Sequence, residues 1–127
     1  LDDLEIGARL APGKNGGLLQ VSGMTYTIDT SIPTPVTIDT NGAVAISGDR
    51  RIRDVFVNGE KLDPKKIYKV ISLDYVLLNG GDGHLFKGAK VIETSFALAY
   101  EILGDYVNQF ENLPEKYKNP EGRIKIK

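Results

Sequence analysis

The sequence has no cysteine and no tryptophan among its 127 residues, and only one histidine, His84. Without cysteine the chain cannot form disulfides, thiolate metal sites or a cysteine nucleophile. A single histidine excludes a histidine-rich metal centre, and with it most Ser–His and metal-hydrolase designs. The chain also lacks a large excess of either charge, because it has sixteen basic and seventeen acidic residues. No global field therefore attracts nucleic acid or an anionic membrane, and no apolar run is long enough to cross a bilayer.

The composition that remains is that of a folded domain. Hydrophobic residues make up 41% of the chain and charged residues 26%, which is too apolar for a disordered segment. The length predicts a single domain over residues 1–127. The sequence starts at Leu1 with neither a methionine nor an apolar signal core. We therefore expect a piece of a longer protein, whose chemistry can lie in the part outside this sequence.

The N-terminal part predicts one helix followed by strands. Leu1–Leu10 has apolar residues three and four apart with acidic residues early, which is typical of an amphipathic helix, and Ala11–Gly17 breaks it. Apolar residues then alternate with polar ones, so that Met24, Tyr26 and Ile28 share one face of a strand. The predicted strand segments are Leu18–Gly23, Met24–Asp29, Val36–Asp39, Ala43–Ile46, Arg51–Val57 and Ile67–Leu73.

Turn signals separate these strands and shape the C-terminal part. Asn41-Gly42 and Asn58-Gly59 predict tight hairpins, and Ala89–Glu93 predicts another short strand. A helix capped by Thr94 or Ser95 should follow and end near Leu113-Pro114. Its apolar stripe, which we expect to be core, consists of Phe96, Tyr100, Leu103, Val107 and Phe110. With a closing strand over Arg123–Ile126, the order predicts an α+β fold with a mostly antiparallel sheet and flanking helices.

Candidate chemistry concentrates in one glycine-dense loop, Asn79–Gly83, with Tyr75 just ahead of it. Glycine permits backbone conformations that other residues cannot hold and lets a ligand approach the main chain. Asp82 in such a loop can accept hydrogen bonds from a pair of sugar hydroxyls. An exposed Tyr75 can stack on a nucleobase, which is worth roughly 1–3 kcal/mol. The alternative is an ordinary tight turn in which Asp82 satisfies backbone amides, and the residues alone leave both interpretations open.

Other polar residues receive structural interpretations. Arg50, Arg51 and Arg53 alternate with apolar neighbours, which indicates the solvated face of a strand in preference to a phosphate-binding patch. His84 follows the loop and is interpreted as a rim or packing residue, because no partner carboxylate can be named that would make it a general base.

Four ordered stretches add a resemblance. They are Gly17–Gly23 with Tyr26 and Asp29; Val55–Gly59 with Leu62–Pro64 and Tyr68–Val70; Asp74-Tyr75 through Asn79–Gly83; and Glu121–Ile124. Any one is weak, but the ordered set resembles the C-terminal domain of the 5′-nucleotidase family, which includes secreted and periplasmic nucleotidases and cyclic-nucleotide phosphodiesterases. The resemblance runs from about Leu1 to the end of the chain.

The resemblance implies a division of labour and a set of site residues. Family enzymes hydrolyse phosphate esters with two divalent metal ions in an N-terminal domain, while the C-terminal domain holds the base between two aromatic rings. Tyr75 matches the second ring, with Val76 as the alternative because the segment to Asp82 is one residue longer than usual. Asp82 matches the ribose contact. The remaining implied contacts are Asn79, Gly80, Gly81, Gly83, Leu18, which stands where phenylalanine is usual, and Gln20 near the base edge.

From these residues we expect the nucleoside-recognition domain of a 5′-nucleotidase or 2′,3′-cyclic-nucleotide 2′-phosphodiesterase/3′-nucleotidase, acting in nucleotide catabolism. The family's phosphate-binding motif and metal ligands are absent from the sequence, so the chain alone should be inactive and should hold neither catalytic residues nor metal. Its expected partners are a nucleoside or nucleotide and an N-terminal metallophosphoesterase domain; nucleic acid and membrane insertion are not expected. The family suggests an extracytoplasmic location (periplasmic, secreted or wall-attached). The alternative is a non-catalytic module that binds carbohydrate or protein.

Overall fold

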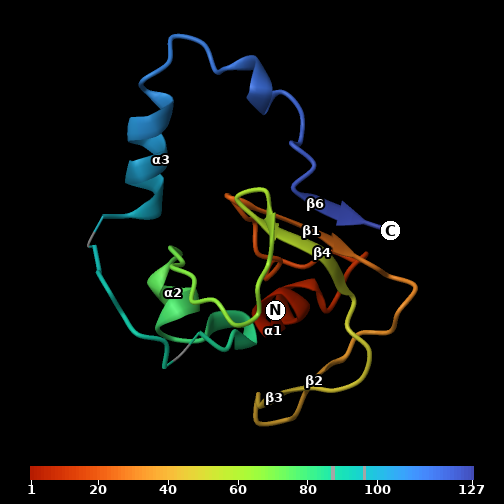
Figure 1. Cartoon of the computed structure of the whole chain (residues 1–127). Coiled ribbons are helices and arrows are strands. Elements are labelled where there is room, and N and C mark those ends of the chain that lie inside the picture. The colour runs from red at the N-terminus through yellow and green to blue at the C-terminus, as the bar shows by residue number, and fades with distance from the viewer. Residues whose placement is uncertain (87, 96) are drawn as a thin grey trace. The chain divides into compact units, whose positions relative to one another are not determined.

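A computed structural model describes residues 1–86, 88–95 and 97–127 of the chain (Figure 1). The chain divides into two compact units, Leu1–Gly88 together with Gly122–Lys127, and Ala89–Glu121. We call the first the sheet unit and the second the α3 unit. The single domain expected over residues 1–127 stays a prediction.

The sheet unit begins with the helix α1, Asp2–Ala8, which confirms the predicted N-terminal helix. Asp2, Asp3 and Glu5 lie in its first turn, where the helix dipole favours negative charge. The helix buries five consecutive residues, Leu4 to Ala8. Such a run cannot fit one face of a helix, because a single buried stripe recurs every three or four residues. The α1 helix is therefore covered on more than one side.

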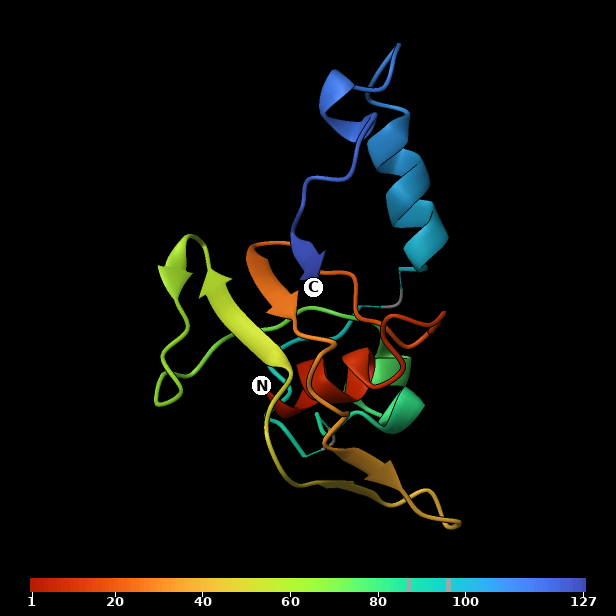
Figure 2. The same cartoon turned by 90° about the vertical axis from the view of Figure 1, so that its right-hand side faces the viewer.

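One side of α1 faces the main sheet, whose strand order is β5-β4-β1-β6. The strands β1 (Met24–Ile28) and β4 (Ile52–Val57) are antiparallel, and β5 (Glu60–Lys61) extends β4 through the predicted Asn58-Gly59 hairpin. The closing strand β6 (Ile124–Ile126) pairs with β1 in parallel. Figure 2 shows α1 beside β1 and β4. The buried core between helix and sheet consists of Leu4, Ala8, Tyr26, Ile28, Ile52 and Val55.

A separate hairpin joins β2 (Val36–Ile38) to β3 (Val44–Ile46). Gly42 in its turn has a φ of 81°, a left-handed conformation that glycine adopts at little cost. The two sheets are mostly antiparallel and are accompanied by helices, so the predicted α+β fold is confirmed.

Three strand predictions are wrong. Leu18–Gly23, Ile67–Leu73 and Ala89–Glu93 carry β-prone residues, but the structure gives them no regular secondary structure. Alternation supplies only local propensity, and a strand also needs a neighbour for its backbone hydrogen bonds. Ile71, at 99% exposure, illustrates how far the second segment lies from any core in the described part of the chain.

The solvated-face interpretation is also wrong for Arg51, which is only 4% exposed. Its guanidinium donates to the carbonyl oxygens of Ala11 at 2.9 Å, Ala8 at 3.4 Å and Arg9 at 3.5 Å, and its Nε donates to that of Asp29 at 3.4 Å. The last carbonyls of a helix have no partner within the helix. Arg51 therefore closes the C-terminal end of α1.

In the α3 unit the only α-helix among the described residues is α3, Ala99–Val107, followed by the 3₁₀ turn η2, Glu115–Tyr117. The helix begins later than predicted: Leu98 is its N-cap residue, and Ser95 Oγ accepts a hydrogen bond from the Ala97 N–H outside the helix. Its end at Val107 likewise precedes the predicted end near Leu113-Pro114.

The expected core stripe is wrong as well, because no residue of α3 is buried. Tyr100 is 70% exposed and Leu103 is 62% exposed, while Phe96 lies outside the described residues. Chains below about 40 residues rarely enclose a core of their own, and the α3 unit is that short. Its main internal contact is the edge-to-face pair of Tyr106 and Phe110, with ring centres 5.2 Å apart.

The buried phenol of Tyr26 predicts a loss of stability at alkaline pH. Burial raises the pKa of Tyr26 to about 12, from 10.0 in the unfolded chain. Below pH 10 the phenol is neutral in both states, so the stabilisation is complete. Between pH 10 and 12 only the unfolded chain releases the proton, and the free energy of unfolding should fall by about 2–3 kcal/mol.

Urea unfolding at pH 9 and pH 12 measures this loss. Tyr26→Phe removes the titrating group and only a weak 3.4 Å hydrogen bond to the Leu19 carbonyl, so its decrease should be smaller by the same 2–3 kcal/mol. Equal decreases in the two proteins would show that Tyr26 does not control alkaline unfolding.

Candidate functional site

The glycine-rich loop Asn79–Gly83 follows the short helix α2, Asp74–Leu77, and ends in the 3₁₀ turn η1, Gly81–Gly83. Gly80, Asp82 and Gly83 adopt left-handed conformations with φ of 66°, 58° and 85°. Glycine and aspartate are among the few residues that tolerate this region. The turn is closed by the Gly83 N–H, which donates to the Gly80 carbonyl at 3.1 Å. The local sequence thus builds a tight projection carrying one carboxylate at its tip.

Tyr75 lies directly against this projection. A Cβ atom placed on Gly81 would come within 2.2 Å of Tyr75 Cε1, so only glycine at this position lets the phenol ring rest on the loop backbone. Tyr75 remains 52% exposed, whereas the neighbouring Val76 is 8% exposed. Of the two residues that could match the family's second ring, Tyr75 is the one presented to solvent.

Asp82 is exposed and reaches toward the loop that follows α1. A Cβ atom on Gly17 would lie 3.1 Å from Asp82 Cγ, so the two loops touch at this point. Within the described part of the chain nothing donates a hydrogen bond to the Asp82 carboxylate, which therefore keeps its acceptor sites for a ligand. This does not support the tight-turn alternative, in which the same carboxylate would satisfy backbone amides.

The remaining predicted contacts are placed less favourably. Leu18 is half-buried and packs against the core of the sheet unit, so it offers only part of its apolar surface. Gln20 is exposed on the same loop, and Asn79 is exposed where α2 ends. The structure thus brings Tyr75 against Gly81 and Asp82 against Gly17, the residue before Leu18.

Both loops are attached to α1. Asn15 donates from Nδ2 to the Gly7 carbonyl at 2.5 Å and accepts from the Gly17 N–H at 2.9 Å. Gly7 allows this approach, because a Cβ there would lie 3.2 Å from the Gly17 carbonyl oxygen. Sequence reasoning missed Asn15, whose only local signal was its place in a glycine-rich break.

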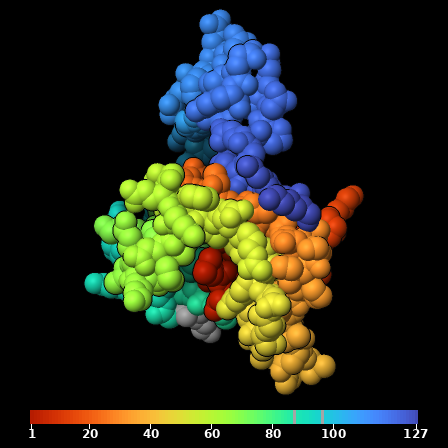
Figure 3. Space-filling model, turned by 45° about the vertical axis from the view of Figure 1, so that its right-hand side comes forward, coloured from red at the N-terminus to blue at the C-terminus, as the bar shows by residue number. Residues whose placement is uncertain are grey.

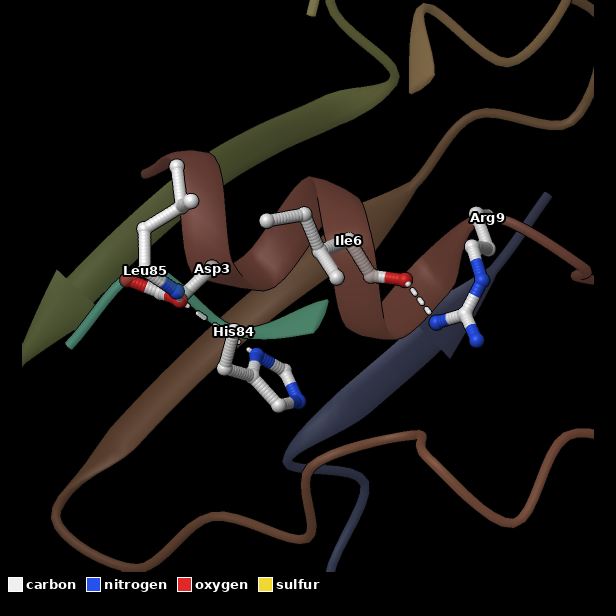
Figure 4. Close-up of polar contacts among 5 residues, drawn as sticks. All are labelled: Asp3, Ile6, Arg9, His84 and Leu85. Carbon is white, nitrogen blue, oxygen red and sulfur yellow. Dashed lines mark hydrogen bonds and ion pairs between the residues drawn. The ribbon is translucent and has the colours of Figure 1, made fainter. Parts of the chain in front are cut away.

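The second loop is attached through Asp3, which sequence reasoning also missed. Figure 4 shows the Asp3 carboxylate directed at the residues after the turn. Its Oδ1 accepts the Leu85 N–H at 2.6 Å and lies 3.3 Å from Nδ1 of His84. His84 is 3% exposed, which fits the packing interpretation, but a partner carboxylate does exist. Neither ring nitrogen of His84 has a hydrogen-bond partner among the described residues.

A hollow of about 460 Å³ opens elsewhere on the sheet unit, beside the first residues of α1, which are red in Figure 3. It is lined by Leu1, Asp2, Asp3, Leu62, Asp63, Pro64, Lys66, Tyr68 and Leu85. None of the predicted contacts lines it.

Across residues 1–86, 88–95 and 97–127, no group of three or more His, Asp or Glu side chains is placed to hold an ion. In the same described residues no helix is both long and apolar enough to span a membrane.

Comparison with known families identifies the class. The sequence model described as "5'-nucleotidase, C-terminal domain" matches residues 1–90, which include α1, the sheet strands β1 to β5 and the whole glycine-rich loop. The chain therefore belongs to the 5′-nucleotidase C-terminal domain family. The match ends close to the boundary between the two units, so the Glu121–Ile124 stretch lies outside it. No curated protein and no solved structure matches the chain.

Proposed function

We propose that this domain recognises the nucleoside part of a nucleotide for a metal-dependent phosphoesterase. The observation that carries the proposal is the combination of an exposed Tyr75 ring resting on Gly81 with an Asp82 carboxylate free of hydrogen-bond partners among the described residues. An aromatic ring can stack on the base, and the two oxygens of a carboxylate can accept hydrogen bonds from the two ribose hydroxyls. Their occurrence within a 5′-nucleotidase C-terminal domain connects them to that substrate class.

Each residue has a distinct role in this proposal. Tyr75, in preference to the buried Val76, stacks on the base, and Asp82 accepts hydrogen bonds from the ribose hydroxyls. Asn79 and the loop glycines let the backbone approach the sugar. Leu18 offers an apolar edge without the ring contact of an aromatic residue, so the base is held less tightly than between two rings. Gln20 lies on the exposed rim, where it can meet the base edge.

Hydrolysis belongs to another part of the enzyme in this proposal. An N-terminal metallophosphoesterase domain of the same protein would hold two divalent ions and cleave a nucleoside monophosphate or a 2′,3′-cyclic nucleotide in nucleotide catabolism, outside the cytoplasm. Binding energy placed on the nucleoside orients the distant phosphate at that site. The present chain contributes recognition and no catalytic residue.

The proposal predicts the effect of removing the Tyr75 ring. Adenosine should bind the 127-residue chain with a Kd of about 1 mM, since one stacking contact and a few hydrogen bonds support roughly 4 kcal/mol. Tyr75→Ala should weaken binding about tenfold or more, because stacking on an aromatic ring contributes roughly 1–3 kcal/mol. NMR titration that follows the amides of residues 79–83 measures both affinities.

The matched control is Tyr100→Ala, which removes an even more exposed phenol (70% against 52% for Tyr75) from α3 and should leave the affinity unchanged. If Tyr75→Ala binds adenosine as well as the unmodified chain does, nucleoside recognition at this loop is wrong. A chain that binds ribose or another sugar as tightly as adenosine would instead favour the carbohydrate-binding alternative.

A further inference from the structure

The glycine-rich loop is held at its C-terminal end by a single carboxylate, that of Asp3 on α1. Oδ1 of Asp3 accepts the Leu85 N–H at 2.6 Å and faces the buried His84 ring at 3.3 Å (Figure 4). From this contact we propose that Asp3 is a positioning residue that fixes Asp82 for its contact with ribose. The inference rests on the proposed function of the same loop.

The loop needs such an anchor because its own bonds are few. The turn is closed by two backbone hydrogen bonds, from the Gly83 N–H at 3.1 Å and the His84 N–H at 3.3 Å. It contains two glycines and an aspartate in left-handed conformations, and glycine loses more conformational entropy on ordering than any other residue. Without an external contact the loop would sample many arrangements, and a ligand would have to order it at the expense of affinity.

Asp3 is built to provide this contact. Its side chain is only 18% exposed, and the group opposite it, His84, has a fully buried side chain. A short bond from a backbone N–H to a carboxylate is among the stronger hydrogen bonds in proteins. Ile6 lies about one helical turn after Asp3, on the same side of α1, and its side chain packs near Gly83 at the end of the loop. The loop is thus fixed to the least exposed segment of the sheet unit.

The two halves of the binding surface depend on Asp3 to different degrees. Tyr75 belongs to α2, whose own backbone bonds include the 2.8 Å bond from the Leu78 N–H to the Asp74 carbonyl. Asp82 lies in the turn that Asp3 restrains, two residues before His84. Loss of Asp3 should therefore disturb contact with the ribose and spare stacking on the base. Selectivity for a nucleoside over the free base is the property that Asp3 controls.

The test compares adenosine and adenine binding to the full natural protein and to its Asp3→Ala variant by NMR titration. We expect the affinity for adenosine to fall about tenfold to a hundredfold, the scale of one lost charge-assisted hydrogen bond, and the affinity for adenine to stay within about twofold. In an Asp82→Ala background the Asp3→Ala change should have no further effect on adenosine, because the contact that it positions is already absent.

Asp2→Asn is the matched control. Asp2 lies in the same helical turn and loses the same charge, but its side chain is half-exposed and pairs with Arg50 Nη1 at 2.7 Å. This variant should keep the selectivity of the unmodified protein. Should Asp3→Ala fail to fold, Asp3→Asn keeps the side-chain shape while it removes the charge opposite His84, and its selectivity should fall in the same direction.

The outcomes separate the two proposals. If Asp82→Ala and Tyr75→Ala weaken adenosine binding but Asp3→Ala and Asp3→Asn leave the ratio of the two affinities unchanged, the positioning role of Asp3 is wrong and nucleoside recognition stands. If Asp82→Ala and Tyr75→Ala have no effect either, the proposed function itself is wrong. Equal losses of adenosine and adenine affinity in Asp3→Ala would indicate general unfolding of the loop, which also overturns the positioning role.

Discussion

Replacing Arg51 with leucine is expected to lower the free energy of unfolding by about 3–5 kcal/mol. The guanidinium donates to four carbonyl oxygens, of which those of Ala8, Arg9 and Ala11 lie at the end of α1. Leucine fills much of the space but donates nothing, so the part-buried carbonyls of Arg9 and Ala11 lose the donor that Arg51 supplies, while the Ala8 carbonyl keeps its 2.9 Å bond from the Ala11 N–H. Each unsatisfied buried polar group costs about 1–3 kcal/mol. Urea unfolding at pH 7 measures the difference.

Arg53→Leu is the matched control for this prediction. Arg53 lies two residues away on β4 and is exposed, so its replacement should change stability by less than about 0.5 kcal/mol. Arg51→Lys should lie between the two, since an ammonium keeps the charge but cannot spread its donors as a planar guanidinium does. Equal effects of Arg51→Leu and Arg53→Leu would contradict the helix-closing role of Arg51.

The elements that the sequence predicted well are those decided by near neighbours. The α1 helix follows from apolar spacing with acidic residues in the first turn, and β1 follows from the alternation of Met24, Tyr26 and Ile28. The hairpins form where Asn-Gly pairs tolerate left-handed backbone, as at Asn58 with a φ of 51°. In each of these cases the deciding interaction spans only a few residues.

The wrong strand predictions and the wrong interpretation of Arg51 depend on residues far away in the sequence. Arg51 carries the alternating pattern of a half-exposed strand, and nothing near it shows that the end of α1, some 40 residues earlier, covers its side chain. The alternation in Ile67–Leu73 is equally genuine, but pairing requires a partner strand that local sequence cannot supply. An alternating pattern gives a local preference for a strand, and tertiary packing decides whether the strand forms and which side chains are buried.

The candidate site also combines features that depend on near neighbours with features that depend on distant residues. Asp82 and its glycines were predictable, because left-handed turns draw on a short list of residues. The contact of Asp3 with Leu85 joins residues 82 positions apart, and His84 showed no partner in its own neighbourhood. The contact of the Tyr75 ring with Gly81 joins residues that are close in sequence. The spacing of apolar residues could not predict it, because it depends on the backbone conformation of the loop. The sequence therefore predicted the turn itself, and the structure adds the contacts that hold it in place.

Ile6→Ala is expected to destabilise the sheet unit by about 2–5 kcal/mol and to loosen the glycine-rich loop. The Ile6 side chain is fully buried at 0% exposure, and a Cβ on Gly83 would lie 3.9 Å from its Cγ2. Truncation leaves a cavity between α1 and the turn, because packed neighbours relax only partly. Urea unfolding measures the stability, and hydrogen exchange at residues 83–85 measures the opening of the loop.

Two further variants show whether burial is the cause. Ile71→Ala removes the same atoms from a side chain that is 99% exposed, and it should change stability by less than about 0.5 kcal/mol. Ile6→Val deletes one methylene group and should cost about 0.5–1.5 kcal/mol, with a smaller increase in exchange. Faster exchange at residues 83–85 in Ile6→Ala, at a rate above that of global unfolding, would identify the α1 contact as the local support of the loop. Exchange that changes only in step with global stability would mean that Ile6 supports the core and gives the loop no local support.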